Sequence, residues 1–120
     1  MTLGAAIDYL GKMDKSKREN YRACIQFVDN SFKKLENRVQ IYHSETDSAL
    51  GVWSFSIAER HPGDLADLFS EKDICLRSGH HCCEPFHRYI GISGTVRMSI
   101  GYETTLAEVE QFFAVLQTLL

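Results

Sequence analysis

The sequence lacks the segments that would attach a protein to a membrane or export it. No apolar run approaches the roughly 20 residues that cross a bilayer, and the N-terminus does not have the basic-then-apolar build of a signal peptide. We therefore expect a cytoplasmic protein with no membrane partner. In that compartment the four cysteines are expected to be reduced thiols rather than a disulfide framework.

A strong excess of charge is also missing. The net charge is -3 with acidic and basic residues interspersed, so no nucleic-acid-binding surface is indicated. Apolar residues make up 44% and charged residues 24%, which is ordinary for a globular protein and argues against disorder. Because there is no internal repeat or flexible linker, residues 1–120 are expected to form a single domain with a modest core.

Apolar residues spaced three and four apart predict four helices. The first covers residues 2–13, and the second begins at a capping box formed by Ser16 and Glu19. The third covers residues 63–72, and the fourth begins at a second capping box, formed by Thr105 and Glu108. The second helix has the clearest core stripe, in which Cys24 is interpreted as a small buried hydrophobe: Tyr21, Cys24, Ile25, Val28, Phe32 and Leu35.

Alternating apolar residues predict strands at 39–41, 52–57 and 96–100, the first two separated by the polar stretch 44–48. A short apolar run at 74–76 is predicted to be another strand, with Cys75 packed inside. Residues 78–94 have no sustained periodicity and are expected to be a long loop with one helical turn at 86–89. Helices flanking a small sheet predict an α+β domain.

Residues 77–85 carry the most chemistry: Arg-Ser-Gly-His-His-Cys-Cys-Glu-Pro. A cysteine acts as a nucleophile or metal ligand only as the thiolate, and neighbouring cationic groups favour that form. Cys82 is therefore a candidate nucleophile. The alternative is that Cys82 is an inert packed thiol with only a structural role. A zinc site is a second alternative, although adjacent residues chelate poorly into one tetrahedron. Its ligands would be His80, His81, Cys82, Cys83 and His87.

Four blocks together resemble the C-terminal (small) domain of group II, Suf-type cysteine desulfurases. These enzymes are pyridoxal-phosphate-dependent members of the class V, fold type I aminotransferase-like group. The order and spacing of the blocks match over nearly the whole chain, which implies the α+β fold of that domain. The blocks are Gly51-Val52-Trp53-Ser54-Phe55, His61-Pro62-Gly63-Asp64, Arg77-Ser78-Gly79-His80-His81-Cys82 and Ser93-Gly94-Thr95-Val96-Arg97-Met98-Ser99.

The resemblance implies that Cys82 is the catalytic cysteine, which attacks the sulfur of substrate L-cysteine to form a persulfide and release alanine. Arg97 matches the family arginine that pairs with the substrate carboxylate, a task that suits a planar two-pronged donor. Arg77 matches another arginine of the motif and is expected to shape the substrate site. His80 and His81 are expected to tune the thiol or orient the loop, and neither is assigned as a general base.

The chain departs from the family in three respects. Cys83 stands where a small residue such as alanine is common. It is either a neutral substitution, which we prefer, or a second thiol that resolves a persulfide into a disulfide. Residues 103–105 are Glu-Thr-Thr, where the family often has Tyr-Asn-Thr. No lysine has the setting of the cofactor lysine and no glycine-rich phosphate cradle is present. Pyridoxal phosphate (PLP) is therefore expected only in a full-length enzyme or with a partner chain, and not on this chain alone.

The sequence thus predicts one part of a cysteine desulfurase that mobilises sulfur for iron-sulfur cluster assembly and is not competent alone. Its expected partners are the missing PLP-binding large domain and a sulfur-acceptor protein, with a homodimer only in the full-length form. Leu3, Ile7 and Leu10 would then be left partly exposed, because they would face the large domain. A stand-alone persulfide carrier and a Cys/His metal-binding module are the alternatives.

Overall fold

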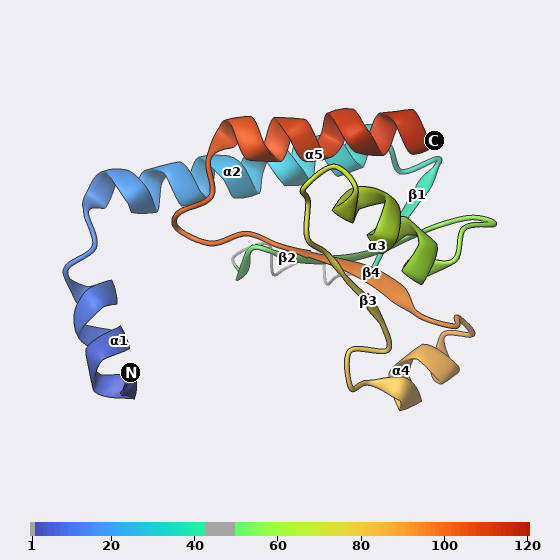
Figure 1. Cartoon of the computed structure of the whole chain (residues 1–120), viewed down its shortest axis with the longest axis horizontal. Coiled ribbons are helices and arrows are strands. Elements are labelled where there is room, and N and C mark those ends of the chain that lie inside the picture. Colours follow the sequence, from blue (N-terminus) through green and yellow to red (C-terminus); the bar gives the residue numbers. More distant parts are fainter. Residues whose placement is uncertain (1, 43–49) are drawn as a thin grey trace.

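The computed structural model describes residues 2–42 and 50–120, so the predicted polar connection at 44–48 lies outside the described residues. Helices and a small sheet alternate along the chain (Figure 1), and the α+β prediction is confirmed. No helix among the described residues is long and apolar enough to cross a membrane. The elements are α1 (Leu3–Gly11), α2 (Lys15–Lys34), β1 (Val39–Ile41), β2 (Val52–Ile57), α3 (Pro62–Ser70), β3 (Arg77–Gly79), α4 (Glu84–Tyr89), β4 (Thr95–Ser99) and α5 (Leu106–Leu119).

The four strands form one antiparallel sheet in the order β1-β2-β4-β3. Strand β4 is therefore internal, with Phe55 of β2 opposite Val96 on one side and Ser78 of β3 opposite Val96 on the other. Helices α2, α3 and α5 lie on one side of this sheet, and α4 lies beyond the end of the β3–β4 pair (Figure 1).

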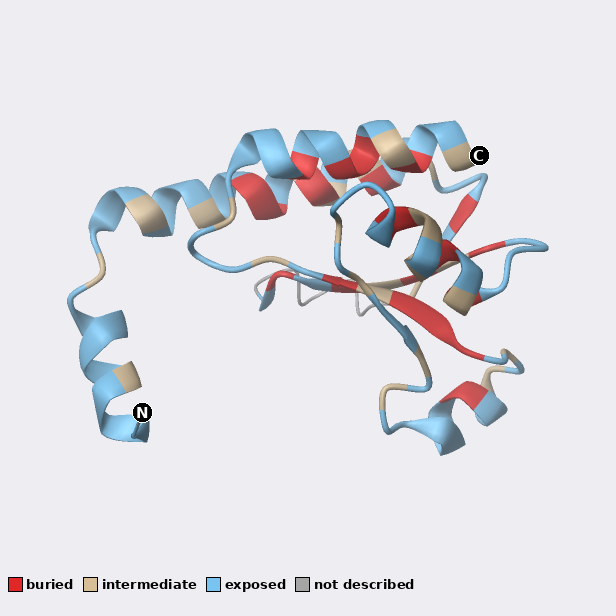
Figure 2. Cartoon of the chain, in the orientation of Figure 1, coloured by how far each residue is buried: buried red, intermediate tan, exposed pale blue. Residues whose placement is uncertain are grey.

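The hydrophobic core fills the space between the sheet and helices α2, α3 and α5 (Figure 2). Because side chains alternate along a strand, β2 and β4 each send every second residue into this core. Aromatic rings join the layers, with Phe69 of α3 stacked on Phe112 of α5 at a centroid distance of 5.0 Å. The remaining positions of the two strands, including Ser54 and Arg97, lie on the other face of the sheet.

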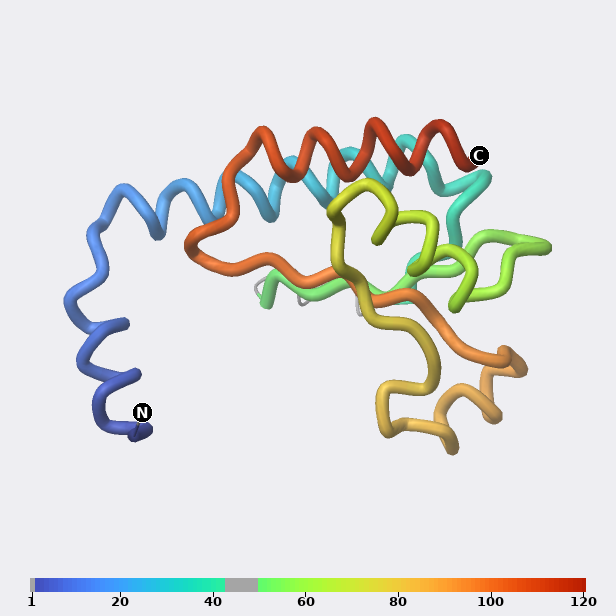
Figure 3. The backbone as a smooth tube through the Cα atoms, viewed as in Figure 1, coloured from blue at the N-terminus to red at the C-terminus, as the bar shows by residue number. Residues whose placement is uncertain are grey.

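Helix α1 stands apart from this body at the N-terminal end (Figure 3). It has no buried residue, and its long-range side-chain hydrogen bond runs from the Tyr9 hydroxyl to Glu103 at 2.8 Å. The expected exposure of its apolar face is confirmed, because Leu3 is 78%, Ile7 60% and Leu10 46% exposed.

The capping predictions are half right. Thr105 and Glu108 form the expected capping box at the start of α5. The box predicted at Ser16 and Glu19 is wrong, because α2 begins two residues earlier than a Ser16 cap requires and Asp14 caps it. The Asp14 carboxylate accepts both the backbone N–H of Ser16, at 3.4 Å, and the Ser16 hydroxyl, at 2.8 Å. Aspartate caps a helix about as well as serine, and its negative charge also interacts favourably with the positive end of the helix dipole.

The strand predicted at 74–76 is also wrong, and β3 begins just after it at Arg77. Residues 74–76 follow a left-handed turn at Asp73, with φ +59, and lie outside the sheet. Ile74 and Leu76 pack on the core while Cys75 between them is exposed, so Cys75 is not the packed residue that was expected. The stretch predicted to be a long loop, 78–94, contains most of β3 and the two-turn helix α4.

Two glycines let β3 and β4 approach closely at the end of their ladder. Gly79 has φ +112 and Gly94 has φ +152, which L side chains rarely adopt. A Cβ added at Gly94 would lie 3.2 Å from both the carbonyl carbon and the carbonyl oxygen of Gly79. Since both of those atoms belong to the backbone, no side-chain rotation can relieve such a contact.

We expect Gly94→Ala to destabilise the fold by about 1–3 kcal/mol, because it adds strain and a backbone clash at the same position. The free energy of unfolding would be measured by urea denaturation followed through the fluorescence of the single tryptophan, Trp53. Gly101→Ala is the matched control, since a Cβ there meets nothing within 4 Å; its effect should stay within about 0.5 kcal/mol. Equal effects for the two variants would show that the close approach does not constrain the fold.

Candidate functional site

The site forms where the β3–β4 pair ends. In the antiparallel register Arg77 lies opposite Arg97, and Gly79 lies opposite Thr95. The chain leaves β3 at Gly79 and enters the turn at residues 80–83 at once. Arg77 and Arg97 thus form one terminal pair of the three-residue ladder, and Cys82 lies in the turn beyond the other terminal pair, Gly79 and Thr95.

The turn that carries Cys82 has an unusual backbone. His81 has φ +52 and Cys82 has φ +61, so two successive non-glycine residues occupy the left-handed region. Such conformations cost on the order of 1–3 kcal/mol each and persist only when the surroundings impose them. The turn closes with a hydrogen bond from the Cys83 N–H to the His80 carbonyl at 2.8 Å. The result is that Cys82 is exposed on a short, fixed turn.

Three side chains impose this turn by a chain of hydrogen bonds centred on Thr95. Nδ1 of buried His87 lies 2.9 Å from the Cys83 carbonyl oxygen, and its Nε2 lies 3.3 Å from the Thr95 hydroxyl. Nε2 of His81 lies 3.1 Å from the same hydroxyl and 3.2 Å from the Thr95 carbonyl oxygen. Both ends of the turn are thereby attached to β4.

The carbonyl oxygens that face the two imidazoles indicate which ring nitrogens carry a proton. A carbonyl oxygen can only accept, so Nδ1 of His87 carries its proton and Nε2 accepts from the Thr95 hydroxyl. The lone pairs of that hydroxyl then accept the Nε2 proton of His81. Every bond of the network is satisfied when both imidazoles are neutral.

His81 is held in the neutral form by its surroundings. Burial lowers the pKa of His81 from its ordinary value of 6.5, and the positive charges of Arg97 and Arg77 are among the groups that lower it further. The hydrogen bond to the Thr95 backbone acts in the opposite direction but is the smaller effect. Both arginines thus lie near enough to the imidazole for their charges to act on it.

Arg77 and Arg97 place two positive charges opposite each other on the β3–β4 pair. Like charges directly opposite on an antiparallel pair are destabilising, and an anion bound between Arg77 and Arg97 would relieve that repulsion. Nε of Arg97 is buried and, in the described part of the chain, has no hydrogen-bond partner. Buried donors are rarely left unpaired, so this N–H is available to an acceptor from outside the described residues. A carboxylate matches the planar guanidinium fork.

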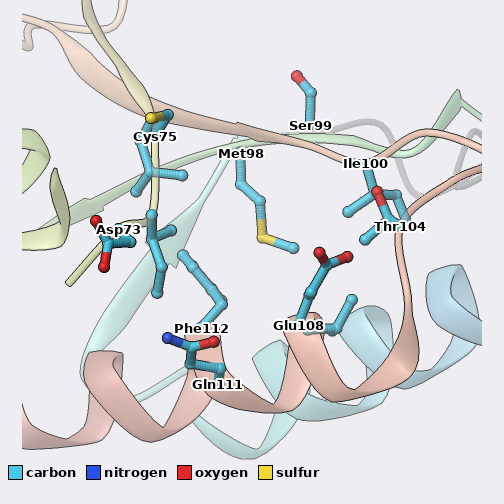
Figure 4. Close-up of a pocket in the computed structure, with 12 residues that line it drawn as sticks. Asp73, Cys75, Met98, Ser99, Ile100, Thr104, Glu108, Gln111 and Phe112 are labelled. Atoms are coloured by element: carbon cyan, nitrogen blue, oxygen red, sulfur yellow. The ribbon is translucent and has the colours of Figure 1, made fainter.

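A pocket of about 260 Å³ lies elsewhere, between the residues before β3, the end of β4 and α5 (Figure 4). Met98 and Glu108 point into it, whereas Ser99 points away. Met98 and Arg97 are neighbours on one strand and project to opposite faces, so this pocket is separate from the arginine pair.

His80 and His81 lie in the turn, as predicted. In the described part of the chain no three His, Cys, Asp or Glu side chains converge on a possible metal position, so the zinc alternative has no geometric support. All six lysines lie in α2, directly after α1 or directly after α3, away from the turn.

Sequence reasoning missed the role of Thr95 and interpreted His87 only as a possible metal ligand. A signal was present for His87, because residues four apart are neighbours on a helix and its ring reaches back to the carbonyl of Cys83. The Thr95 contacts had no local signal, since they join residues 8 and 14 positions apart.

Acidification should destabilise the protein through His81. Because its pKa is lowered in the folded state, the unfolded chain binds a proton first as the pH falls below about 6.5, and the free energy of unfolding decreases. Urea midpoints at about pH 7.5 and about pH 5.5 would show a smaller decrease for His81→Gln, which donates a hydrogen bond but does not titrate. An unchanged decrease would show that His81 is not held neutral.

Comparison with known proteins shows the family and the fold of the chain. The family model described as "Aminotransferase class-V" matches residues 1–112. A "Probable cysteine desulfurase" of Pyrococcus abyssi is 36% identical over 98% of this chain and 29% of its own length. Another, of Synechocystis, is 30% identical over 98% of this chain and 28% of its own length. The chain therefore spans less than a third of these curated relatives.

Solved structures have the same fold. The apo structure of a cysteine desulfurase from Thermococcus onnurineus NA1 matches with a TM-score of 0.84 and 32% identity, over 96% of this chain and 29% of that one. The Escherichia coli cysteine desulfurase CsdA, in an S-sulfonic acid form, matches with a TM-score of 0.77 and 23% identity, over 95% and 28%, and supports the fold alone. With the family model covering nearly all of its residues, the chain belongs to the class V aminotransferase family.

Proposed function

We propose that residues 1–120 form the C-terminal domain of a group II, Suf-type cysteine desulfurase. In this proposal Cys82 accepts sulfur from L-cysteine, and Arg97, assisted by Arg77, binds the substrate carboxylate. One observation carries the proposal: exposed Cys82 lies in the turn after β3, and β3 and β4 set Arg77 opposite Arg97, whose buried Nε has no hydrogen-bond partner among the described residues. This arrangement provides a nucleophile and an anion site within one small region.

The chemistry of the chain's own residues follows from their types. Arg97 holds the substrate carboxylate in two-pronged fashion and so fixes which way the substrate sulfur points. The Cys82 thiolate forms a bond to that sulfur, the bond between the sulfur and the β-carbon breaks, and its electrons leave with the carbon that becomes alanine. PLP supplies the electron sink for this step when bound. A persulfide remains on Cys82.

The cofactor must then come from a region outside these residues. The chain matches less than a third of its curated relatives, and it carries no suitably placed lysine. The apolar face of α1, formed by Leu3, Ile7 and Leu10, is exposed and is the surface that the PLP-binding large domain would cover. Without that domain we expect no desulfurase activity.

The same proposal implies a sulfur acceptor, a compartment and an oligomeric state for the full-length enzyme. The persulfide would pass to a sulfur-acceptor protein in the cytoplasm for iron-sulfur cluster assembly, and the full-length enzyme would be a homodimer. The exposure of Cys82 on a chain without a cofactor lysine favours one alternative, a stand-alone persulfide carrier. Transfer of persulfide to this chain in trans, with no docking of a large domain, would distinguish that carrier from the desulfurase domain.

In a polypeptide that unites this chain with its PLP-binding domain, Cys82→Ser should reduce persulfide formation from L-cysteine by at least about a hundredfold. The serine hydroxyl cannot store sulfur and is a much weaker nucleophile. Protein-bound sulfane sulfur would be measured after a single turnover. Cys75→Ser is the control, because Cys75 is also exposed but lies outside the site. Equal loss in both variants would contradict the assignment.

Arg97→Lys in the same polypeptide should raise the KM for L-cysteine by about tenfold to a hundredfold, because an ammonium group cannot reproduce the two-pronged contact. Steady-state alanine production would measure it. Arg88→Lys serves as the control, since Arg88 pairs with Glu84 on the exposed surface at 2.7 Å. A KM unchanged by the Arg97 substitution would rule out its role as carboxylate ligand.

A further inference from the structure

We propose that Cys82 and Cys83 form a discharge switch. A persulfide on Cys82 that no acceptor collects is expelled as sulfide by Cys83, and the two cysteines become a disulfide that closes the site until it is reduced. The inference rests on the proposed function, because that function places the persulfide on Cys82. It concerns the fate of the persulfide rather than its formation.

Cys82 and Cys83 are adjacent residues in the turn. His81 on one side is attached to Thr95, the Cys83 carbonyl on the other is attached to His87, and the Cys83 N–H closes the turn onto His80. Cys82 and Cys83 therefore lie between two anchors, and both are exposed. No hydrogen bond to either sulfur is found in the described part of the chain, so both thiols are available to react.

Cys83 has no structural task that would explain a cysteine at this position. It is the N-cap residue of α4, where serine, threonine, aspartate or asparagine would stabilise the helix, yet its side chain makes no capping bond. It also contributes nothing to the core, in contrast to Cys24, which is fully buried. What remains for the Cys83 thiol is its chemistry beside Cys82.

The step balances without an external oxidant. The Cys83 thiolate attacks the inner sulfur of the persulfide, the Cys82 sulfur itself. The bond from that sulfur to the outer sulfur breaks, and the outer sulfur departs as hydrosulfide with the electron pair. A persulfide is already at the oxidation level of a disulfide, so the product is a Cys82–Cys83 disulfide and one sulfide.

Attack at the inner sulfur is also the route that the geometry favours over transfer of the outer sulfur to Cys83. Thiol exchange requires the three sulfurs to lie nearly in line. In attack at the inner sulfur the leaving hydrosulfide is outside the ring that forms, so it can take the position opposite the nucleophile. In attack at the outer sulfur both the nucleophile and the leaving group belong to the same small ring, which cannot straighten.

The disulfide would be easily reversed. Successive Cα atoms are about 3.8 Å apart, closer than the 4.4–6.8 Å that is usual for disulfides, and such strain makes the bond more reducible. A cellular dithiol reductant, which supplies two electrons, would therefore restore both thiols. While the bond exists, Cys82 cannot accept sulfur, so turnover stops when acceptor is scarce.

The test uses the full 120-residue chain with Cys75→Ser as background, which removes the one exposed thiol outside the turn. The reduced protein would be treated with inorganic polysulfide without oxygen, desalted quickly, and followed in time. Sulfide release would be measured together with intact mass and peptide mass. The Cys83→Ser and Cys82→Ser derivatives are the matched controls, and serine at the N-cap is compatible with α4.

The background chain should release sulfide at least about tenfold faster than either derivative, because a neighbouring thiol reacts intramolecularly. Its mass should change from a gain of sulfur to a loss of two hydrogens, with the cross-link in the peptide that contains residues 82 and 83. Both derivatives should keep their persulfide. Equal rates in all three proteins, or a stable persulfide on Cys83 of the background chain, would overturn the proposal.

This experiment needs no cofactor and no substrate cysteine. A negative result would therefore remove the switch and leave the desulfurase assignment untouched. Conversely, if Cys82 gains no sulfur from L-cysteine in the completed enzyme, the assignment fails, whatever the polysulfide experiment shows.

Discussion

The hydrogen-bonded pairing of β3 with β4 is the interaction on which the candidate site depends. Strand β3 has only three residues, and its register sets Arg77 opposite Arg97 and Gly79 opposite Thr95. The close approach of Gly79 and Gly94 brings the following turn within reach of Thr95. On its other face β4 contributes Val96 and Met98 to the core, so packing energy holds the site in register.

One face of the sheet is covered by helices that pack into a core, whereas groups without partners lie outside that core. The helix side has a closed aromatic core that links α2, α3 and α5. Beyond the core, two arginines face each other, the buried Nε of Arg97 has no partner among the described residues, and α1 exposes an apolar face. Each of these features has an energetic cost that a bound carboxylate and a covering domain would remove, which is why we treat the chain as one part of a larger enzyme.

Sequence reasoning succeeded where the signal was local. Periodicity identified the core face of α2 and α5, and the capping box at Thr105 was found from its spacing. It failed where a more distant or stronger partner decided the outcome. Asp14 caps α2 in place of Ser16. The three residues of β3 have no alternating apolar pattern that sequence reasoning could detect, and they form a strand because they pair with β4.

The site shows the same division. Cys82, Arg97 and Arg77 were selected from motif blocks, and the structure places them on the β3–β4 pair and the turn that follows it, while their roles stay predictions. The links from Thr95 to His81 and His87 could not be foreseen, because they depend on the fold closing over sequence separations that local patterns do not encode.

The central claim is that this chain completes a PLP-dependent site carried mainly by another domain. It is tested most directly by isolating the native polypeptide from source cells with an antibody raised against residues 79–87 and measuring its size and bound cofactor. The account predicts a polypeptide several times larger than this chain that carries PLP. A polypeptide of this chain's own size, with no PLP-bearing protein attached to it, would contradict the account.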